Sequence, residues 1–539
     1  MCTGNLERVL NPPGPSALRP AGSRPRTLGE VAAHLGRPVP DVPADRRDEH
    51  VDQDARVVRG VTHDSRAVQP GDLYAALPGS RAHGAEFADR AVKAGAVACL
   101  TDAAGKSRTT AAGLPTFVVD DPRRVLGRLA AWIYGDPAGE MLTIGITGTN
   151  GKTTTAYLLD AGLRAAGCST GLIGTIETRI GDEVLASVRT TPEAPDLQAL
   201  LAVMRERGVG AAVMEVSSHA LALGRVDGTA YDVAVFTNLS EDHLDFHADL
   251  EDYYAAKASL FTPGRCRSGV VNVDDEHGAR LAREASVPVV TLSPSGSPSG
   301  SPSGAAAQWR VTDADLGPDG STFTLLGPAG ERVRSGTALV GDFNLVNAAL
   351  ALVALAVAGV DLERAAAGVL ACPGVAGRME RVVADRDAGG PLALVDFAHS
   401  PDALARLLAT CRGLVEPGGR LVLVIGAGGD RDPYKRSVMG EIAARAADLV
   451  VLTSDNPRSE DPDAILAAMR AGADGVHSST VEVVPDRRAA IGRAVALAGR
   501  GDVLVVAGKG HEQGQEVDGV VHPFDDRLVL REALRPVRR

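Results

Sequence analysis

Short apolar runs alternate with longer stretches of helical spacing through the middle of the chain. Strands that alternate with helices are typical of a mostly parallel sheet with helices on its faces. The pattern therefore predicts an α/β fold. The strand-like runs lie at residues 141–146, 211–214, 233–236 and 269–273. An Ala-rich apolar stretch at 348–360 is shorter than the roughly 20 residues that cross a membrane, so it is predicted to be a buried helix.

A second set of apolar runs occupies the last third of the chain, and each run leads directly into a polar motif. In open α/β sheets, ligands bind beyond the carboxyl ends of the strands. Four motifs at four such ends therefore predict one shared crevice. The runs are 392–395, 421–425, 449–452 and 503–506, and the motifs are D-F-A-H-S-P-D (396–402), G-A-G-G-D-R-D (426–432), D-N-P-R (455–458) and G-K-G-H-E (508–512).

The first part of the chain is patterned less clearly. Residues 1–55 are rich in Pro, Arg and Asp, and we expect a mostly disordered extension with one short helix near 28–35. The expected domains are 56–135, 136–375 and 376–539. A Ser/Pro/Gly repeat at 293–304 is predicted to be a flexible surface insertion in the second of them.

Composition excludes several classes of protein. The chain has 539 residues and a net charge of −12, which argues against a nucleic-acid-binding protein. Six cysteines are scattered without a C-x-x-C pair, so neither a zinc site nor a disulfide framework is expected, and a reducing cytoplasm fits. No apolar targeting segment or membrane span is predicted. We expect a monomer that acts on small molecules.

A glycine-rich loop follows the first strand of the central domain and opens a helix at 153–166. The loop reads Gly148-Thr149-Asn150-Gly151-Lys152-Thr153-Thr154, which is shorter than the usual Walker A spacing. Backbone N–H groups at a helix N-terminus bind phosphate, and Lys152 adds positive charge. Thr153 can reach Mg²⁺. The loop predicts a site for a nucleoside triphosphate.

Two further polar motifs follow strands of the same domain: M-E-V-S-S-H (214–219) and T-N-L-S-E-D-H-L-D-F-H (237–247). A carboxylate and an imidazole beside a phosphate loop suit Mg²⁺ and phosphate, which favours a metal role for Glu215 and His243. The alternatives are a solvated loop carboxylate and, for His243 and His247, ordinary surface histidines. Lys257 lies on a predicted helix, and its pattern alone indicates a lysine that faces solvent.

Lysine is scarce, at six residues against 50 arginines. A chain that keeps lysine where arginine would supply the same charge indicates a need for amine chemistry or a compact charge. Four of the six lie in or beside the motifs: Lys152, Lys257, Lys435 and Lys509.

Taken together, these motifs resemble the Mur ligases, a family of ATP-dependent ligases of bacterial cell-wall synthesis. The resemblance also covers Y-Y-A-A-K (253–257), G-D-F-N-L-V-N-A (341–348) and G-R-M-E (377–380), and it runs from about residue 61 to 526. It implies three α/β domains: a UDP-recognising N-terminal domain, a central P-loop-type ATPase domain with a mostly parallel sheet, and a Rossmann-like C-terminal domain.

The resemblance also implies roles for individual residues. Gly148 to Thr154 would hold ATP, and Lys152, Glu215, His243 and Lys257 would be catalytic. Mg²⁺ would be held by Thr153, Glu215, His243 and Lys257, the last as a carbamate. The UDP-linked dipeptide would be bound by Ser65, Ser80, Arg81, Ala82, Thr190, Thr191, Ser217 and Arg225. Diaminopimelate would be bound by Arg431, Asp455, Asn456, Pro457, Arg458, Gly508 and Glu512.

The implied reaction is the ATP-dependent addition of diaminopimelate to the D-Glu of UDP-N-acetylmuramoyl-L-Ala-D-Glu through an acyl phosphate. Arg458 or Arg431 can take the distal carboxylate of diaminopimelate, and Glu512 its ammonium. Lysine lacks that carboxylate and would leave the cations unpaired. The sequence does not distinguish meso- from LL-diaminopimelate.

Several alternatives remain open on the sequence. A lysine-adding member of the family or a folylpolyglutamate synthase would share the phosphate loop, but D-N-P-R and G-K-G-H-E disfavour both. A P-loop NTPase switch would hydrolyse ATP without an acceptor. An inactive scaffold is disfavoured by the intact Lys152, Glu215, His243 and Lys257. The chain differs from the residues usual in the family at five positions. These differences concern individual contacts to the substrates and not the reaction; they are Arg189, Leu223, His63, Tyr434 and Ser437.

Overall fold

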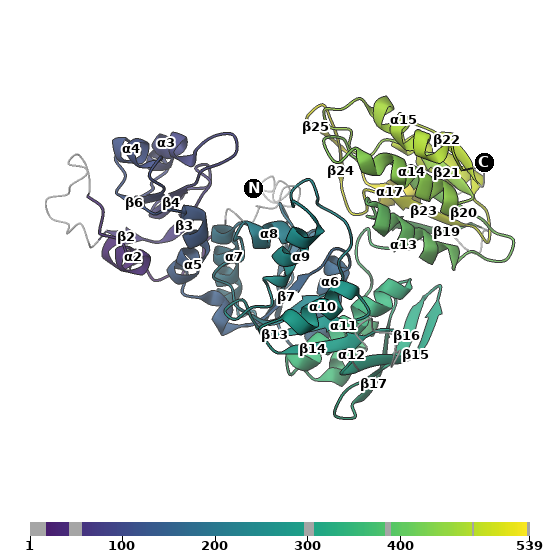
Figure 1. The fold of residues 1–539 in the computed structure, drawn as a ribbon, viewed down its shortest axis with the longest axis horizontal. Coiled ribbons are helices and arrows are strands. Elements are labelled where there is room, and N and C mark those ends of the chain that lie inside the picture. Colours follow the sequence, from purple (N-terminus) through teal and green to yellow (C-terminus); the bar gives the residue numbers. More distant parts are fainter. Residues whose placement is uncertain (1–17, 42–55, 296–306, 383–389, 477–478, 536–539) are drawn as a thin grey trace, which may run out of the picture.

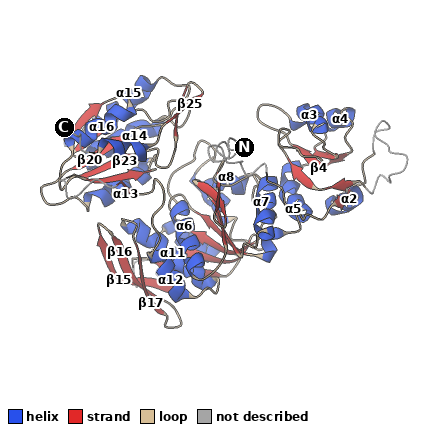
Figure 2. Ribbon diagram, turned by 180° about the vertical axis from the view of Figure 1, so that it is seen from behind, coloured by secondary structure: helices blue, strands red, loops and turns tan. Residues whose placement is uncertain are grey.

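The computed structural model describes residues 18–41, 56–295, 307–382, 390–476 and 479–535. The chain forms three α/β bodies that follow one another in sequence order from one end of the molecule to the other (Figure 1). Helices lie on both sides of the strands in each body (Figure 2). The α/β class predicted from the alternation of apolar runs is confirmed.

The N-terminal body is built on a parallel sheet of four strands in the order β3-β4-β5-β6. These strands are β3 (Gly60–Thr62), β4 (Asp72–Ala76), β5 (Ala98–Thr101) and β6 (Thr116–Val118). The helices are η4 (Gly84–Phe87), α3 (Ala88–Lys93), α4 (Lys106–Ala111) and α5 (Pro122–Ile133). Asp121 caps α5 and Pro122 opens it, which is the usual start of a helix.

Residues 18–41 pack onto this body, so the expectation of a disordered extension is wrong for them. The strand β1 (Arg26–Thr27) pairs with β2 (Val57–Val58), and α2 (Leu28–Leu35) matches the predicted short helix. Thr27 and Glu30 form a capping box at its start. Leu28 and Val31 are fully buried in the domain core. Residues 1–17 and 42–55 lie outside the described residues.

The central body contains an eleven-stranded sheet in the order β10-β9-β8-β11-β7-β12-β13-β14-β15-β16-β17. Neighbouring strands from β8 to β15 are parallel, and the strands at both ends are antiparallel. The strands are β7 (Leu142–Thr147), β8 (Thr170–Ile173), β9 (Glu177–Ile180), β10 (Glu183–Ala186), β11 (Ala211–Glu215), β12 (Tyr231–Phe236), β13 (Cys266–Asn272), β14 (Val289–Ser293), β15 (Trp309–Gly317), β16 (Gly320–Leu326) and β17 (Arg332–Thr337).

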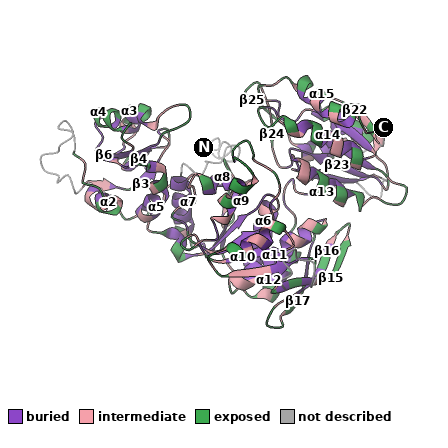
Figure 3. Ribbon diagram, in the orientation of Figure 1, coloured by how far each residue is buried: buried purple, intermediate pink, exposed green. Residues whose placement is uncertain are grey.

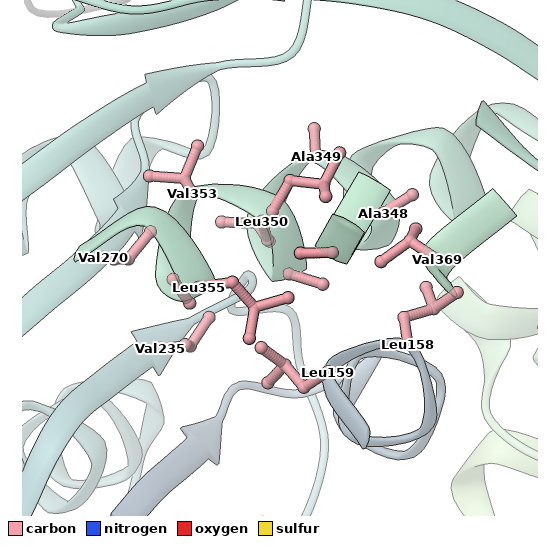
Figure 4. Close-up of a cluster of buried hydrophobic side chains, with 14 of the residues drawn as sticks. Leu158, Leu159, Val235, Val270, Ala348, Ala349, Leu350, Val353, Leu355 and Val369 are labelled. Atoms are coloured by element: carbon pink, nitrogen blue, oxygen red, sulfur yellow. The ribbon is translucent and has the colours of Figure 1, made fainter. Parts of the chain in front are cut away.

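The core of the central body lies between this sheet and a buried helix, α11 (Asp342–Val357), which corresponds to the predicted one. Leu350, Leu355 and Val353 of this helix pack near Val235 of β12 and Leu159 of α6 (Figure 4). Because α11 is apolar on nearly all sides, it is covered by neighbours rather than half-exposed (Figure 3). The helices are η5 (Pro137–Glu140), α6 (Lys152–Ala165), α7 (Ala194–Glu206), α8 (Ser218–Ala222), α9 (Leu250–Ala258), α10 (Glu276–Glu284), α11 and α12 (Leu362–Leu370). Most of the predicted insertion at 293–304 lies outside the described residues.

The C-terminal body holds a six-stranded sheet in the order β18-β19-β23-β20-β21-β22, parallel except at β18. The four predicted strands are present as β19 (Leu392–Asp396), β20 (Leu421–Ile425), β21 (Leu449–Leu452) and β23 (Val503–Ala507). The remaining elements are β18 (Glu380–Val382), β22 (Thr480–Val483), β24 (Gly514–Val517), β25 (Val520–Pro523), α13 (Pro401–Arg412), α14 (Tyr434–Ala446), α15 (Pro462–Ala473), α16 (Arg487–Leu497) and α17 (Asp526–Ala533).

Parallel register places the carboxyl ends of neighbouring strands at one edge of each sheet. In the central sheet, Ile146 pairs with Glu215, and Thr147 pairs with Phe236. In the C-terminal sheet, Asp396 pairs with Ala507. The polar motifs that follow these strands therefore begin side by side. Within the described residues, no helix combines the length and apolarity needed to cross a membrane.

Candidate functional site

The glycine-rich loop turns tightly between β7 and α6. Gly148 has φ 144°, and a Cβ there would lie 1.9 Å from the Thr237 hydroxyl oxygen. Gly151 has φ 87°, and a Cβ there would lie 2.4 Å from Asn347 Oδ1. A side chain at either position would be strained and would clash, so both glycines are required by the loop shape.

Lys152 is the first residue of α6 and folds back over the loop. Its Nζ donates to the carbonyl oxygens of Gly148 and Thr149, each at 2.9 Å. Burial lowers the pKa of this lysine. Lysine and the N-terminus of a long helix together form a site that favours an anionic group.

Glu215 is the last residue of β11 and is fully buried. Its carboxylate accepts the hydroxyl of Thr153 at 2.9 Å, and the N–H and hydroxyl of Thr175 at 2.7 and 3.0 Å. The alternative of a solvated loop carboxylate is therefore wrong. A carboxylate beside a threonine hydroxyl is an oxygen pair of the type that binds Mg²⁺.

His243 lines the same cavity as this pair, from a loop where it adopts a positive φ of 57°. Burial lowers its pKa to about 4, so the imidazole is neutral at neutral pH and has a lone pair for a metal or a proton. His219 packs edge-to-face against it, with ring centroids 4.9 Å apart. His247 is buried at 2% exposure and pairs with Asp252 at 3.0 Å, so it is not an ordinary surface histidine.

Lys257 is buried at 1% exposure on α9, which contradicts the expectation of a lysine that faces solvent. Its Nζ donates to the Gly148 carbonyl at 2.7 Å and lies 4.3 Å from the centre of the Tyr253 ring. Burial, with the nearby Lys152 charge second, holds its pKa well below the usual value for lysine. Helical spacing could not reveal this burial, because α9 packs through this face against the glycine-rich loop.

A cavity of about 650 Å³, the loop cavity, opens over this loop. Residues 149–154, Glu215 and His243 line it. It is also lined by residues to which sequence reasoning gave no role, although their motifs stood out: Phe343, Asn347, Arg378, Asp396 and His399. Burial lowers the pKa of Arg378 and raises that of Asp396.

The C-terminal body closes one side of the loop cavity. Asp402 of α13 accepts hydrogen bonds from the Asn150 side chain at 3.2 Å and from the Ser240 hydroxyl at 2.8 Å. Two domains are thus joined directly at the tip of the glycine-rich loop.

A second cavity of about 850 Å³, the interdomain cleft, lies between the central and C-terminal bodies. All four strand-end motifs of the C-terminal body contribute to its lining, as the shared crevice predicts. From the central body come Thr190, Thr191, Ser217, Arg225 and His243; from the C-terminal body come Arg431, Asp455, Asn456, Arg458, Gly508 and Glu512.

Two of the cationic side chains of the C-terminal lining, Arg458 and Arg431, differ in how they are held. Arg458 donates to the Gly429 carbonyl at 2.6 Å and pairs with Glu516 at 3.3 Å, from a backbone with φ 53°. Arg431 also lines the loop cavity and is exposed. Glu516 was not predicted, because its short strand β24 carries no motif.

An arginine cluster borders the other end of the interdomain cleft. Glu193 pairs with Arg225 at 2.9 Å, with Arg123 at 3.3 Å and with Arg189 at 3.6 Å. Arg123 comes from α5 of the N-terminal body, so this carboxylate links two domains. Neither Glu193 nor Arg123 belongs to a motif that sequence reasoning singled out.

Four of the residues expected to bind the UDP-linked dipeptide lie in the N-terminal body, outside the lining of both cavities: Ser65, Ser80, Arg81 and Ala82. Their two loops leave the neighbouring parallel strands β3 and β4 at the same edge. Ser65 is buried, whereas Ser80 and Arg81 are exposed and Ala82 is half-buried. Arg66 is tied to Asp64 at 2.8 Å.

In the part of the chain that the structure describes, no cluster of three His, Cys, Asp or Glu side chains forms a ready-made metal site. Of the proposed Mg²⁺ ligands Glu215, Thr153 and His243, only two are His, Cys, Asp or Glu residues. Mg²⁺ binding would therefore also need the Thr153 hydroxyl and a further anionic ligand. The cysteines in the described ranges, Cys99, Cys168, Cys266, Cys372 and Cys411, are free thiols.

Comparisons with known proteins agree with this geometry. Models of the Mur ligase family match residues 57–134 (the family's catalytic domain), 146–355 (the middle domain) and 377–510 (the glutamate ligase domain). A UDP-N-acetylmuramoyl-L-alanyl-D-glutamate–2,6-diaminopimelate ligase of Streptomyces avermitilis is 57% identical over 527 residues, covering 97% of this chain and 99% of that protein. A UDP-N-acetylmuramyl-tripeptide synthetase of Leifsonia xyli is 46% identical over 530 residues, covering 97% and 99%.

Solved structures give the same result. A UDP-N-acetylmuramoyl-L-alanyl-D-glutamate–2,6-diaminopimelate ligase matches with a TM-score of 0.62 at 33% identity, over 90% of this chain and 97% of that one. A Mycobacterium tuberculosis folylpolyglutamate synthase complexed with ADP shares the fold, with a TM-score of 0.56 at 22% identity over 72% and 92%. With matches over nearly its whole length and a glycine-rich loop facing a cleft between two domains, the chain belongs to the Mur ligase family of enzymes.

Proposed function

We propose that the enzyme uses ATP to join diaminopimelate to the D-Glu of UDP-N-acetylmuramoyl-L-Ala-D-Glu in peptidoglycan precursor synthesis. One observation carries this proposal. The loop cavity and the interdomain cleft share lining residues, among them Thr190, Ser217, His243 and Arg431. A phosphoryl group held over the loop is therefore next to a cleft that is large enough for a peptide and an amino acid. The names of the similar ligases support the choice of substrates.

In the first step, the D-Glu γ-carboxylate attacks the ATP γ-phosphorus. The new bond is carboxyl oxygen to phosphorus, and the bond to the β-phosphate oxygen breaks to release ADP. Lys152 and the N–H groups of α6 stabilise the negative charge on the transferred group. Thr190, Thr191 and Ser217 hold the dipeptide on the cleft side of the loop.

In the second step, the amine of diaminopimelate attacks the acyl carbon. The tetrahedral intermediate collapses with loss of phosphate and of the amine proton, which leaves the amide. The departing phosphate takes up that proton, so the neutral imidazole of His243, which lines both cavities, stays available as a ligand. The Asp402 bridge keeps the cleft closed over the loop and limits water that would hydrolyse the acyl phosphate.

Mg²⁺ would be held by Thr153, Glu215, His243 and a carbamate on Lys257, and would neutralise charge on the nucleotide phosphates. Glu215 and Thr153 already share a hydrogen bond, and a neutral buried Lys257 amine is the form that reacts with CO₂. We place the reaction in the cytoplasm, where both ATP and reduced cysteines occur, and we propose a monomer.

The preference for diaminopimelate rests on the charges of the C-terminal lining. Arg431 and Arg458 can pair with the distal carboxylate, and Asp455 and Glu512 can pair with the distal ammonium. A lysine substrate has no distal carboxylate, so it would leave the arginine side chains of the cleft without a partner, and lysine is therefore disfavoured as a substrate. A nucleotide-dependent switch needs no such cleft beside its phosphate loop.

Phosphate release tests the proposal. We expect turnover with the UDP-linked dipeptide and diaminopimelate, and at least about 100-fold lower kcat/KM with L-lysine. Assaying the meso and LL isomers separately fixes the stereochemistry. Efficient turnover with lysine alone would refute the specificity, and ATP hydrolysis that is independent of both acceptors would refute ligase activity.

A second experiment addresses Glu215. The change Glu215→Gln keeps the shape but removes the charge: the amide oxygen can still accept the N–H of Thr175, and the amide NH2 donates to the hydroxyls of Thr153 and Thr175 instead of accepting from them. We expect kcat to fall by about 10²–10³-fold, with little change in the melting temperature. Glu284→Gln, at an exposed carboxylate that pairs with Arg280, is the matched control and should retain activity. Full activity of Glu215→Gln would exclude a role for this charge.

A further inference from the structure

A lysine without an assigned role lies beneath the lining of the amino-acid end of the cleft. Lys509 follows β23 and is fully buried. Its Nζ donates to Asn456 Oδ1 at 3.0 Å and to Glu512 Oε2 at 2.9 Å, and it lies 3.9 Å from Asp455 Oδ1. The lysine therefore contacts two of the strand-end motifs at once, although it does not itself line the cleft.

The contacts of Lys509 fix the Glu512 carboxylate in one orientation. Oxygen Oε2 of Glu512 accepts from Lys509 and, at 2.8 Å, from the Asn456 amide. Asn456 is held in turn, because its Oδ1 also accepts the backbone N–H of Glu516 at 3.0 Å. With Oε2 engaged from behind, the carboxylate is oriented by a closed network rather than by solvent.

Charge gives Lys509 a second effect. Asp455 and Glu512 are two carboxylates on facing loops, and Asp455 Oδ2 lies 2.5 Å from the point where a Cβ of Gly508 would stand. One buried ammonium between them leaves a single net negative charge, which matches one substrate ammonium. Arginine would have to place a larger planar fork at a position where the side chain is fully buried, which disfavours the exchange. This explains why lysine is kept in a chain with 50 arginines and six lysines.

We propose that Lys509 is a positioning residue that sets recognition of the distal ammonium of the amino-acid substrate by orienting Glu512 and balancing Asp455. The proposal rests on the proposed function, because it assumes diaminopimelate as the substrate. It concerns one end of that substrate only: the distal carboxylate is bound by other groups.

Two substrate analogues separate the two ends. The compound 2-aminopimelate keeps the reacting amine and both carboxylates but lacks the distal ammonium, whereas L-lysine keeps the ammonium and lacks the distal carboxylate. The readout is kcat/KM for diaminopimelate relative to each analogue. Lys509→Met removes charge and hydrogen bonds, and Lys509→Gln removes the charge but keeps an amide that can bond Asn456 and Glu512.

We expect both variants to lower the preference for diaminopimelate over 2-aminopimelate by about 30-fold or more. The ratio of diaminopimelate to L-lysine should stay within about threefold, because both compounds carry the ammonium, and the KM for ATP should not change. Lys93→Met, at an exposed lysine of α3, is the matched control.

An unchanged or increased preference over 2-aminopimelate in a folded variant would overturn the proposal and leave Lys509 with a purely structural role. Melting curves identify a variant that does not fold, and Lys509→Gln then supplies the test. If the wild-type enzyme itself does not use diaminopimelate, the proposed function fails instead, so the two failures are distinguishable.

Discussion

Lys257→Arg is expected to lose about 10²–10³-fold in kcat while the protein stays folded. The amine of Lys257 is buried, bonded to the Gly148 carbonyl, and its pKa is held well below the usual range, so the unprotonated form that adds to CO₂ is favoured. In that addition a nitrogen–carbon bond forms, one C=O π bond of CO₂ opens and the amine proton leaves to solvent, which turns a neutral amine into an anionic oxygen ligand. A guanidinium stays protonated and cannot follow this course.

Phosphate release in CO₂-depleted buffer measures this dependence. Wild-type activity should fall and return on adding bicarbonate, and labelled bicarbonate should give a carbamate carbon signal that Lys257→Arg lacks. Lys106→Arg, at an exposed lysine of α4, should behave as wild type. Full activity of Lys257→Arg, or wild-type activity that is indifferent to CO₂, would exclude the carbamate.

Arg487→Met is expected to destabilise the C-terminal body by about 3–5 kcal/mol, because it leaves a buried carboxylate without its partner. Arg487 and Asp526 are both fully buried and paired at 2.7 Å. The same guanidinium donates to the carbonyls of Ser454 and Ala507, the residues just before D-N-P-R and G-K-G-H-E. The KM for diaminopimelate should therefore rise more than the KM for ATP.

Native-state hydrogen exchange of β21 and β23 reports the stability of this body separately from the other two. Exchanging both partners, as in Arg487→Met with Asp526→Leu, should recover much of the loss, since an apolar pair of similar volume carries no desolvation cost. Arg488→Met is the matched control, because Arg488 and Glu532 form an exposed pair between the same two helices. Its effect should stay below about 1 kcal/mol; an equal effect at both positions would contradict the argument.

Much of the fold could be predicted, because strands of a parallel sheet are apolar on both faces and are visible as continuous runs. The runs at 392–395 and 449–452 are examples, and β19 and β21 begin at the same residues. A strand without buried positions was missed: β22 has two half-buried residues between two exposed ones. The segment 18–41 was misjudged, because its helix buries only one face and several of its other contacts are single polar ones, such as Arg19 with Asp72.

The site could be located for a geometric reason. Residues that follow parallel strands meet at one edge, so Glu215 and the motif at 455–458 were found from position alone. Whether an individual side chain is buried could not be predicted in this way. Lys257 and Lys509 have the local sequence of surface residues, and only packing between distant segments buries them. The ion pairs of Glu193 could not be predicted for the same reason, because its arginine partners come from three places in the chain.

The distribution of lysine has a practical consequence for following this enzyme at work. Of its six amino side chains, only Lys93 and Lys106 are exposed, and the other four lie in or beside the two cavities. An amine-directed acylating reagent should therefore modify Lys93 and Lys106 at a constant rate, which serves as an internal standard. The rates at Lys152, which lines the loop cavity, and at Lys435, which lines the interdomain cleft, would report how often the domains part. Mass-spectrometric footprinting could thus follow the opening of the cleft without an engineered probe.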